Sequence, residues 1–317
     1  MERVFITGVT GFIGSEIARK LIEENNYELS GLVRTTANKI SLKPIQDITD
    51  NINIRFGNFT DPLTIRKIIK DVSPNYIIHV GGRTEVRESF DQSQEYQETN
   101  YLGTINLIQA AKEVSDFRKF IFASTMETYG WQTQRTPFKE NLKQNPASPY
   151  AVSKLACEEY IRMENKVSGF PFIISRACNT YGRKDNIGFV TEYIITSMLK
   201  NKPVYLGTPN AVRDMMYVED HVNAYITSLK SNVVNEVFNF GTGSMTSMIE
   251  LAEKIKKMIN SESKIIPHWP PDYPYRPVSE EFLSLDSAKA KEILGWQPKY
   301  SLDEGLKRTI SHWKEKT

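Results

Sequence analysis

The feature that most constrains this chain is a glycine-rich segment near its start, TGVTGFIG at residues 7–14. It follows a short apolar run and precedes a helix predicted over residues 13–24 by its apolar spacing. Glycines at this place allow a tight bend and close approach of the backbone to a pyrophosphate, while the helix N-terminus offers free N–H groups. The spacing is G-x-x-G-x-x-G rather than the commoner G-x-G-x-x-G. Its position still favours a dinucleotide-binding turn over a flexible loop, with coenzyme contacts at Gly8, Gly11, Phe12, Ile13 and Gly14.

Short β-branched runs alternate with helical patterns through the first half of the chain. The predicted strands cover residues 4–6, 27–33, 52–56, 76–80, 119–123 and 172–175, and the predicted helices cover residues 13–24, 62–70, 92–114 and 150–167. This alternation predicts an α/β fold, a Rossmann-type doubly wound parallel sheet. After residue 178 the pattern loosens. We therefore expect a dinucleotide-binding domain at residues 1–178 and a smaller C-terminal substrate-binding lobe at residues 179–317, with some segments returning to the main sheet.

The end of the second predicted strand bears on which coenzyme is bound. An acidic residue there binds the ribose hydroxyls of NAD, whereas a basic one accommodates the extra phosphate of NADP. Arg34 occupies this place, so the sequence favours NADP over NAD, unless Arg34 stacks on adenine or faces solvent. Asn58 follows the third strand, and Gly81 and Gly82 follow the fourth. Ligands of parallel sheets bind at these strand ends, so all three are further predicted coenzyme contacts.

A second group of residues has the chemistry of a catalytic set. Tyr150 and Lys154 are four positions apart in a predicted helix and share one face. A nearby ammonium favours a phenolate, so we expect Lys154 to lower the pKa of Tyr150. Thr125 and Glu127 follow the fifth strand, where a hydroxyl can bond the reacting oxygen and a carboxylate can act as acid or base. The pattern Y-x-x-x-K alone arises often by chance, and Glu127 has an equal alternative as a surface or ion-paired residue.

Composition excludes several other classes of protein. The formal net charge of +2 lacks the strong basic bias of a nucleic-acid binder. No apolar run is long enough to span a bilayer and the N-terminus lacks a signal-peptide core, so we expect a cytoplasmic protein with no membrane partner. Cys157 and Cys178 are too few for a disulfide framework and are expected to be reduced. The four histidines lack metal-ligand spacing, so no metal site is predicted.

Together these residues resemble the extended short-chain dehydrogenase/reductase family, and within it the nucleotide-sugar epimerases and dehydratases. The resemblance spans nearly the whole chain. Beyond the segments above, the matching motifs are NYLGT (100–104), RACNTYG (176–182), RDMMYVED (213–220), NFGTG (239–243) and LGWQP (294–298). The chain departs from the family where Asn58 replaces the usual Asp, where Gly81 and Gly82 replace two alanines, and where Arg83 follows them.

The resemblance implies roles for individual residues and a partner. It implies catalysis by Thr125, Tyr150 and Lys154, with Glu127 as the added carboxylate, and coenzyme binding by Asn100, Tyr150 and Lys154 beside the glycine turn. It implies that a nucleotide-diphosphate sugar is bound by Asn179, Arg213 and Arg276. It also implies a homodimer formed through the helices near residues 100–114 and 150–167.

The resemblance leaves the reaction open among several outcomes that begin with oxidation at sugar C4. Sugar 4,6-dehydratases of the family have Thr-Asp-Glu or Thr-Ser-Glu after the fifth strand, whereas this chain has Thr125, Met126 and Glu127. Glu127 places a 4,6-dehydratase slightly ahead of a 4-epimerase, and a 4-reductase or dehydrogenase that exchanges coenzyme with solvent is a third candidate. A non-catalytic dinucleotide sensor is a remote alternative, because such proteins can lose the tyrosine that is present here.

Overall fold

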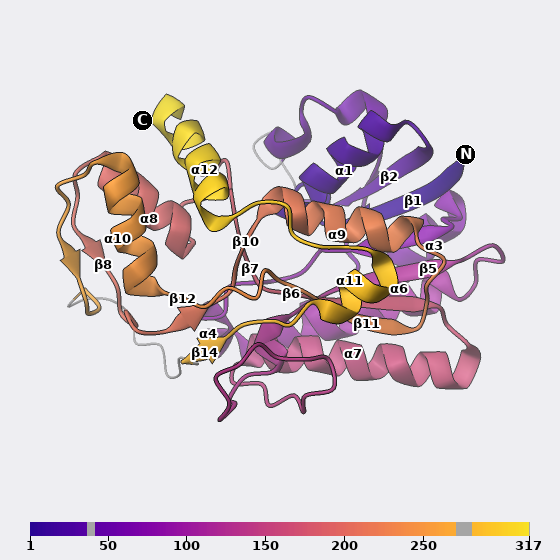
Figure 1. Cartoon of the computed structure of the whole chain (residues 1–317). Coiled ribbons are helices and arrows are strands. Elements are labelled where there is room, and N and C mark those ends of the chain that lie inside the picture. Colours follow the sequence, from indigo (N-terminus) through magenta and orange to yellow (C-terminus); the bar gives the residue numbers. More distant parts are fainter. Residues whose placement is uncertain (37–41, 271–280, 317) are drawn as a thin grey trace. The chain divides into compact units, whose positions relative to one another are not determined.

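A seven-stranded sheet forms the centre of the computed structural model, which describes residues 1–36, 42–270 and 281–316 (Figure 1). Its strand order is β11-β6-β5-β4-β1-β2-β3. The strands are β1 (Glu2–Thr7), β2 (Tyr27–Val33), β3 (Asn53–Phe56), β4 (Tyr76–His79), β5 (Lys119–Thr125), β6 (Phe172–Ala177) and β11 (Glu236–Phe240). β1 pairs in parallel with both β2 and β4, so the chain winds outward in two directions from this point. The predicted doubly wound sheet is confirmed.

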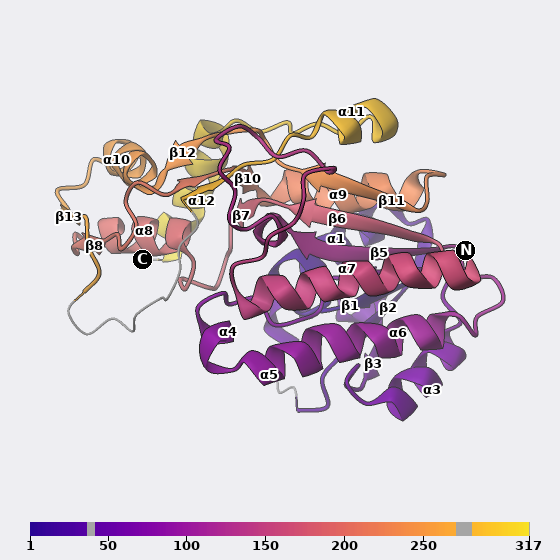
Figure 2. The same ribbon diagram turned by 90° about the horizontal axis from the view of Figure 1, so that it is seen from below.

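Helices cover both faces of this sheet (Figures 1 and 2). They include α1 (Phe12–Glu24), α3 (Pro62–Val72), α6 (Gly103–Ala111), α7 (Pro149–Ser168) and α9 (Val218–Lys230). α3, α6 and α7 lie on one face, where their apolar side chains join those of the strands in one buried cluster that includes Ile69, Leu107, Ile161 and Phe120. Central strands are buried on both faces, which accounts for their continuous apolar runs rather than alternation.

The predicted continuous helix at residues 92–114 is wrong in detail. The structure breaks it into α5 (Ser93–Tyr96), a π-helical segment η3 (Gln97–Leu102) and then α6, and a short helix α4 (Glu88–Asp91) precedes them. In η3 the carbonyl of Asn100 accepts hydrogen bonds from the Thr104 hydroxyl at 2.5 Å and from the Cys157 thiol at 3.3 Å. A π-turn adds a residue to the helical ladder, often at a functional site, and apolar periodicity does not reveal it.

The chain forms two compact units. The first comprises residues 1–128, 148–176 and 222–238, and the second comprises residues 129–147, 177–221 and 239–317. The boundary predicted at residue 178 assigns residues 129–147 to the first domain and residues 222–238 to the second. The two units assign these segments the other way round. Residues 236–240, as β11, lie at the edge of the main sheet beside β6.

The second unit contains short strands and four helices within its described residues. The strands pair as β7 (Asn179–Tyr181) with β10 (Met215–Tyr217), β9 (Val212–Arg213) with β12 (Thr246–Ser247) and β14 (Phe282–Leu283), and β8 (Val204–Tyr205) with β13 (Ile265–Ile266). The helices are α8 (Val190–Leu199), α10 (Met248–Ile259), α11 (Ala288–Leu294) and α12 (Leu302–Lys316). Short 3-10 turns η1 (Lys43–Ile45), η2 (Thr49–Asn51) and η4 (Met126–Thr128) complete the described elements. Across those described elements, no helix combines the length and apolarity that a membrane crossing requires.

Candidate active site

The glycine turn between β1 and α1 has the backbone geometry that a pyrophosphate site needs. Gly8 has φ +69°, and the amide of Gly11 donates to the carbonyl of Gly8 at 2.8 Å. A Cβ added at Gly14 would lie 2.1 Å from that carbonyl oxygen, so no larger residue fits without a backbone shift. No side chain caps the N-terminus of α1 and no acidic residue lies in its first turn. The helix therefore presents amides and a positive dipole end to a phosphate, which fits the predicted coenzyme.

The other predicted coenzyme contacts lie at the same ends of the strands. A Cβ at Gly81 would meet the Thr7 hydroxyl at 2.9 Å, so the backbone after β4 packs directly against the end of β1. A Cβ at Gly82 would lie 2.8 Å from the side-chain amide oxygen of Asn100. Arg34 and Asn58 follow β2 and β3 and are exposed. Their assignment as coenzyme contacts remains a prediction.

Tyr150 and Lys154 lie in the first turns of α7. Ser148 caps this helix by accepting a hydrogen bond from the Ala151 amide at 3.1 Å, and Pro149 suits its first turn. Both side chains are buried, with 8% of Tyr150 and 4% of Lys154 exposed. The Lys154 ammonium donates to the carbonyl of Ala123 on β5 at 2.8 Å. α7 therefore brings the Lys154 ammonium to the end of the fifth strand.

The expected effect of Lys154 on Tyr150 is not seen in the structure. Burial raises the pKa of Tyr150 above its ordinary value, the charge of Glu127 acts in the same direction, and hydrogen bonding to Thr125 opposes them. Lys154 instead contacts the β5 carbonyl and lies 4.8 Å from the centre of the Phe122 ring. Tyr150 is therefore a protonated phenol at neutral pH in this state of the protein.

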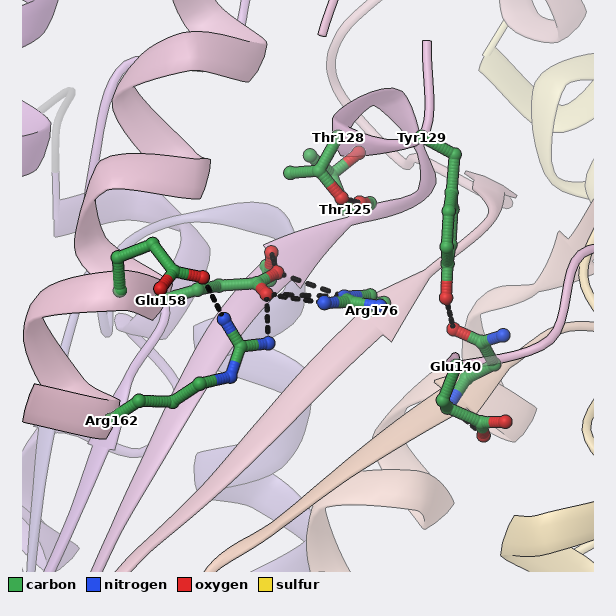
Figure 3. A network of polar contacts seen from close by, with 10 residues as sticks. Thr125, Thr128, Tyr129, Glu140, Glu158, Arg162 and Arg176 are labelled. Carbon is green, nitrogen blue, oxygen red and sulfur yellow. Dashed lines mark hydrogen bonds and ion pairs between the residues drawn. The ribbon is translucent and has the colours of Figure 1, made fainter. Parts of the chain in front are cut away.

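Thr125 and Glu127 complete the group at the end of β5. The Glu127 amide donates to the Thr125 hydroxyl oxygen at 3.2 Å. The Thr128 hydroxyl donates to the Thr125 carbonyl at 2.9 Å, and Figure 3 labels these two threonines. Glu127 is 8% exposed, so the alternative of a surface residue is wrong. Its charge contributes to the raised pKa of Tyr150, so the carboxyl group lies within electrostatic range of the phenol. A phenol, a hydroxyl and a carboxyl group are thus available together for proton transfer.

A buried hydrogen-bond chain that the sequence did not predict starts at Thr7 and runs through His79. The Gly81 amide donates to the Thr7 hydroxyl oxygen at 3.1 Å, and Thr7 and His79 Nδ1 are 2.6 Å apart. His79 Nε2 lies 3.0 Å from the Thr104 hydroxyl, whose own proton goes to the Asn100 carbonyl. Thr104 must therefore accept from Nε2–H, which leaves Nδ1 to accept from Thr7. Burial, with a smaller effect of the Lys154 charge, holds the pKa of His79 well below its ordinary value.

Asn100 extends this chain to α7. Its side-chain amide donates to the Ser153 hydroxyl oxygen at 3.0 Å and to the Arg83 carbonyl at 3.1 Å, and its oxygen accepts from the Arg83 amide at 2.8 Å. Ser153 in turn donates to the carbonyl of Tyr150 at 2.7 Å. Asn100 thus connects β4, η3 and α7, and its role as a coenzyme ligand remains a prediction. No signal in a single sequence distinguishes such a connecting His or Asn from an ordinary core residue.

The residues predicted to bind the substrate diphosphate lie in the second unit. The Asn179 amide donates to the Asp214 carbonyl at 3.2 Å, and the Arg213 side chain, 6% exposed, donates to the Val212 carbonyl at 2.9 Å. The buried carboxylate of Asp214 accepts from the amide and hydroxyl of Thr242 at 3.0 and 2.6 Å and so fixes the strand that carries Arg213. Arg276 lies outside the described residues. Among the residues that are described, no group of His, Cys, Asp and Glu is arranged to hold a metal ion.

The chain is similar to known proteins over nearly its full length. Residues 5–309 match the family model described as GDP-mannose 4,6 dehydratase. The chain is 37% identical over 317 residues to a Methanocaldococcus jannaschii protein described provisionally as a UDP-glucose 4-epimerase, with 98% of each covered. It is 31% identical over 321 residues to the dTDP-D-glucose 4,6-dehydratase of Bos taurus, with 99% of this chain and 89% of that protein covered.

Solved structures agree with these relatives. The UDP-glucose 4-epimerase of Thermotoga maritima with UDP-glucose has a TM-score of 0.89 at 29% identity, and 99% of each chain is covered. The UDP-glucose 4-epimerase of Thermus thermophilus in complex with NAD has a TM-score of 0.88 at 26% identity, covering 99% of this chain and 100% of that one. The similarity therefore includes both units and is not confined to the glycine turn.

Proposed function

This chain belongs to the extended short-chain dehydrogenase/reductase family, in its group of nucleotide-sugar epimerases and dehydratases, and we propose that it is a 4,6-dehydratase. It is an NAD(P)-dependent enzyme that acts on a nucleotide-activated sugar through a 4-keto intermediate. The observation that favours dehydration is the buried carboxylate of Glu127 beside Tyr150 and Thr125. Removal of water across sugar C5 and C6 needs a group that moves protons at those atoms, and we assign that role to Glu127.

The proposed reaction assigns one task to each side chain. The glycine turn at Gly8, Gly11 and Gly14 would hold the coenzyme, which would supply hydride transfer at the sugar. Tyr150 takes the proton of the C4 hydroxyl, and Thr125 hydrogen-bonds the same oxygen. The raised pKa of Tyr150 means that this transfer needs a nearby cation, which Lys154 provides, to stabilise the phenolate. Glu127 removes the C5 proton and protonates the departing C6 hydroxyl, so that one molecule of water is released. The hydride taken from C4 is then returned to C6, and a proton that exchanges with solvent is returned to C5.

A 4-epimerase is the second candidate, and Met126 favours it. Met126 is buried, with 1% exposed, and its thioether cannot donate a proton. Only one carboxyl group therefore follows Thr125 in η4. An epimerase needs only the Tyr150 proton transfer at C4, because hydride returns to the opposite face of the same carbon. Glu127 would then contribute to binding alone.

The test is the product formed when purified protein is incubated with UDP-glucose, dTDP-glucose or GDP-mannose without added coenzyme. A C6 methyl signal beside a ketone in the NMR spectrum supports the dehydratase, and an isomer with an intact hydroxymethyl group contradicts it. Tyr150→Phe separates both enzymes from a non-catalytic sensor. It should lower turnover by about 100-fold or more and leave coenzyme binding nearly unchanged.

We further propose that the coenzyme is NAD rather than NADP. The related Thermus thermophilus structure contains NAD, and the preference for NADP drawn from Arg34 has no support from the comparisons. The exposed Arg34 side chain is compatible with the alternative that it faces solvent. Chromatography of the nucleotide released when the purified protein is denatured should identify NAD. Release of NADP would restore the interpretation based on Arg34.

A homodimer through α7 is the proposed assembly. Leu107, Ile108 and Ile161 are fully buried in the core of the first unit and are not available for a partner. α7 instead exposes Val152, Met163 and Val167, which are 45, 41 and 74% exposed. Such a stripe of apolar side chains favours an interface. In light scattering, Met163→Glu should give a smaller particle than the wild type, whereas Met245→Glu, at a more exposed position of the second unit, should not.

A further inference from the structure

Glu158 is a fully buried carboxylate on α7, one helical turn after Lys154 (Figure 3). The Arg176 guanidinium donates to it through Nη2 at 2.6 Å and through Nε at 3.0 and 3.2 Å, and Arg162 donates at 2.8 Å. Burial opposes ionisation, but hydrogen bonding and charge from Arg176, followed by the charge of Arg162, outweigh it and keep the pKa of Glu158 below its ordinary value. Glu158 is therefore a buried negative charge, one helical turn along α7 from Lys154 of the proposed active site.

Stability alone does not explain such a group. Removing two charges from water costs free energy that their attraction often fails to return, and an apolar pair of similar volume is commonly as stable. The side chains of Glu158 and Arg176 are 0 and 2% exposed, so this cost applies to both. The position of the pair relative to other functional groups gives a more specific explanation.

Glu158 contacts the end of β5 directly. The Ser124 hydroxyl donates to a carboxylate oxygen of Glu158. Ser124 lies between Ala123, whose carbonyl accepts the hydrogen bond from Lys154, and Thr125, whose hydroxyl is placed beside Tyr150. One carboxylate therefore fixes the backbone that supplies both the acceptor for Lys154 and the hydroxyl of the catalytic set.

Glu158 is also the negative charge closest in the helix to the Lys154 ammonium. Burial lowers the pKa of Lys154, and Cys157 and Glu158 oppose this. Burial raises the pKa of Cys157 to about 11, so that thiol is neutral near pH 7. His79 on β4 and Tyr150 on α7 also face this region and are neutral, and Glu127 on η4 acts on Tyr150. Of the groups named for Lys154, Glu158 carries the charge that favours its protonated form.

We propose that Glu158 is a positioning residue of the active site, which uses its charge to support the Lys154 cation and its contact with Ser124 to align Thr125. Arg176 keeps the carboxylate ionised and correctly oriented. This inference rests on the proposed function, which assigns catalytic roles to Lys154 and Thr125. The contacts that carry it, however, lie within the first unit and can be tested without substrate.

The direct test is the titration of Lys154 in protein labelled with ¹³C at the lysine ε-carbons, with the signal assigned by its loss in Lys154→Met. In Glu158→Gln the midpoint should move to lower pH, because the negative charge that favours the cation is gone. Glu158→Gln with Arg176→Met should displace the midpoint in the same direction but by less, because a positive charge is removed together with the negative one. It leaves no unpaired arginine, which keeps the test decisive if the single variant folds poorly. Glu158→Asp should restore the midpoint at least in part.

Glu159→Gln is the matched control, because Glu159 is the next residue of α7, also pairs with Arg162, and is 65% exposed. It should leave the Lys154 midpoint unchanged. An unchanged midpoint in the folded double variant, or an equal displacement in Glu159→Gln, would overturn the proposal. In turnover assays Glu158→Gln should lower kcat by about 10-fold, the size seen when a group supporting a reactive residue is lost, with little change in KM. If the wild type acts on no nucleotide sugar, the proposed function fails, while the titration still decides the role of Glu158.

Discussion

At the scale of single residues, the site combines groups whose charges are set by burial. Tyr150 is a neutral phenol, Lys154 a buried amine and Glu127 a buried carboxyl group, all at the end of one strand. Burial raises the pKa of Tyr150 and lowers the pKa of Lys154, so the surroundings set the acidity of both groups. Groups arranged in this way exchange protons with a bound substrate more readily than exposed ones, because small changes of charge in the site change their protonation.

Replacing Glu127 by Gln should have two separable effects. The charge of Glu127 raises the pKa of Tyr150, so removal of that charge should lower the pKa. Ultraviolet titration measures it when the curve of the double variant with Tyr150→Phe is subtracted from the curve of Glu127→Gln. If Glu127 moves protons at C5 and C6, dehydration should also slow by about 100-fold or more. Unchanged turnover in Glu127→Gln would remove the basis for the dehydratase assignment.

His79 should remain neutral across the pH range in which the protein is folded. Its hydrogen bonds require the Nε2–H tautomer, which ¹⁵N NMR of the imidazole distinguishes from the other forms. The pKa of His79 is lowered in the folded state. As pH falls below about 6.5, His79 is therefore protonated in the unfolded chain but stays neutral in the folded protein. The free energy of unfolding should therefore decrease below that pH. A charged His79 in folded protein at pH 6 would contradict the proposed chain of hydrogen bonds.

At the scale of elements, the sequence was informative wherever local pattern and backbone geometry agree. The predicted strands and the helices at residues 13–24, 62–70 and 150–167 match β1 to β6, α1, α3 and α7 closely. The break at η3 was missed, because it depends on the contacts of Asn100 with Thr104 and Cys157 across two helices. The Glu158 network was missed for the same reason, since nothing in a helical pattern tells a buried charge from an exposed one.

Gly14→Ala should weaken coenzyme binding more than any exposed change in α1. The added Cβ would lie 2.1 Å from the carbonyl oxygen of Gly8, so the turn or the helix must move. Such overpacking costs about 1–3 kcal/mol and displaces the amides that face the pyrophosphate. Calorimetric titration with NAD measures the loss. Lys20→Ala, at an exposed position of the same helix, is the control and should bind as the wild type does.

At the scale of the whole molecule, the fold and family were predictable but the reaction was not. Motifs spread from residue 7 to residue 298 specify the family. The glycines among them, for example, allow the tight turn and close backbone packing that the fold requires. Epimerases and dehydratases share this framework, and both occur among the relatives and solved structures. The two reactions differ in the proton transfers near C5 and C6. Glu127 favours a dehydratase, whereas Met126 favours an epimerase.

The measurement that tests the central claim most directly is the reaction run in deuterium oxide with the substrate found in the product screen. A dehydratase that uses Glu127 removes the C5 proton and replaces it from solvent, so the product should carry one deuterium at C5 beside a C6 methyl group. The C4 hydrogen that moves as hydride should not exchange. A product with an intact hydroxymethyl group and no carbon-bound deuterium would contradict the account and identify the enzyme as a 4-epimerase.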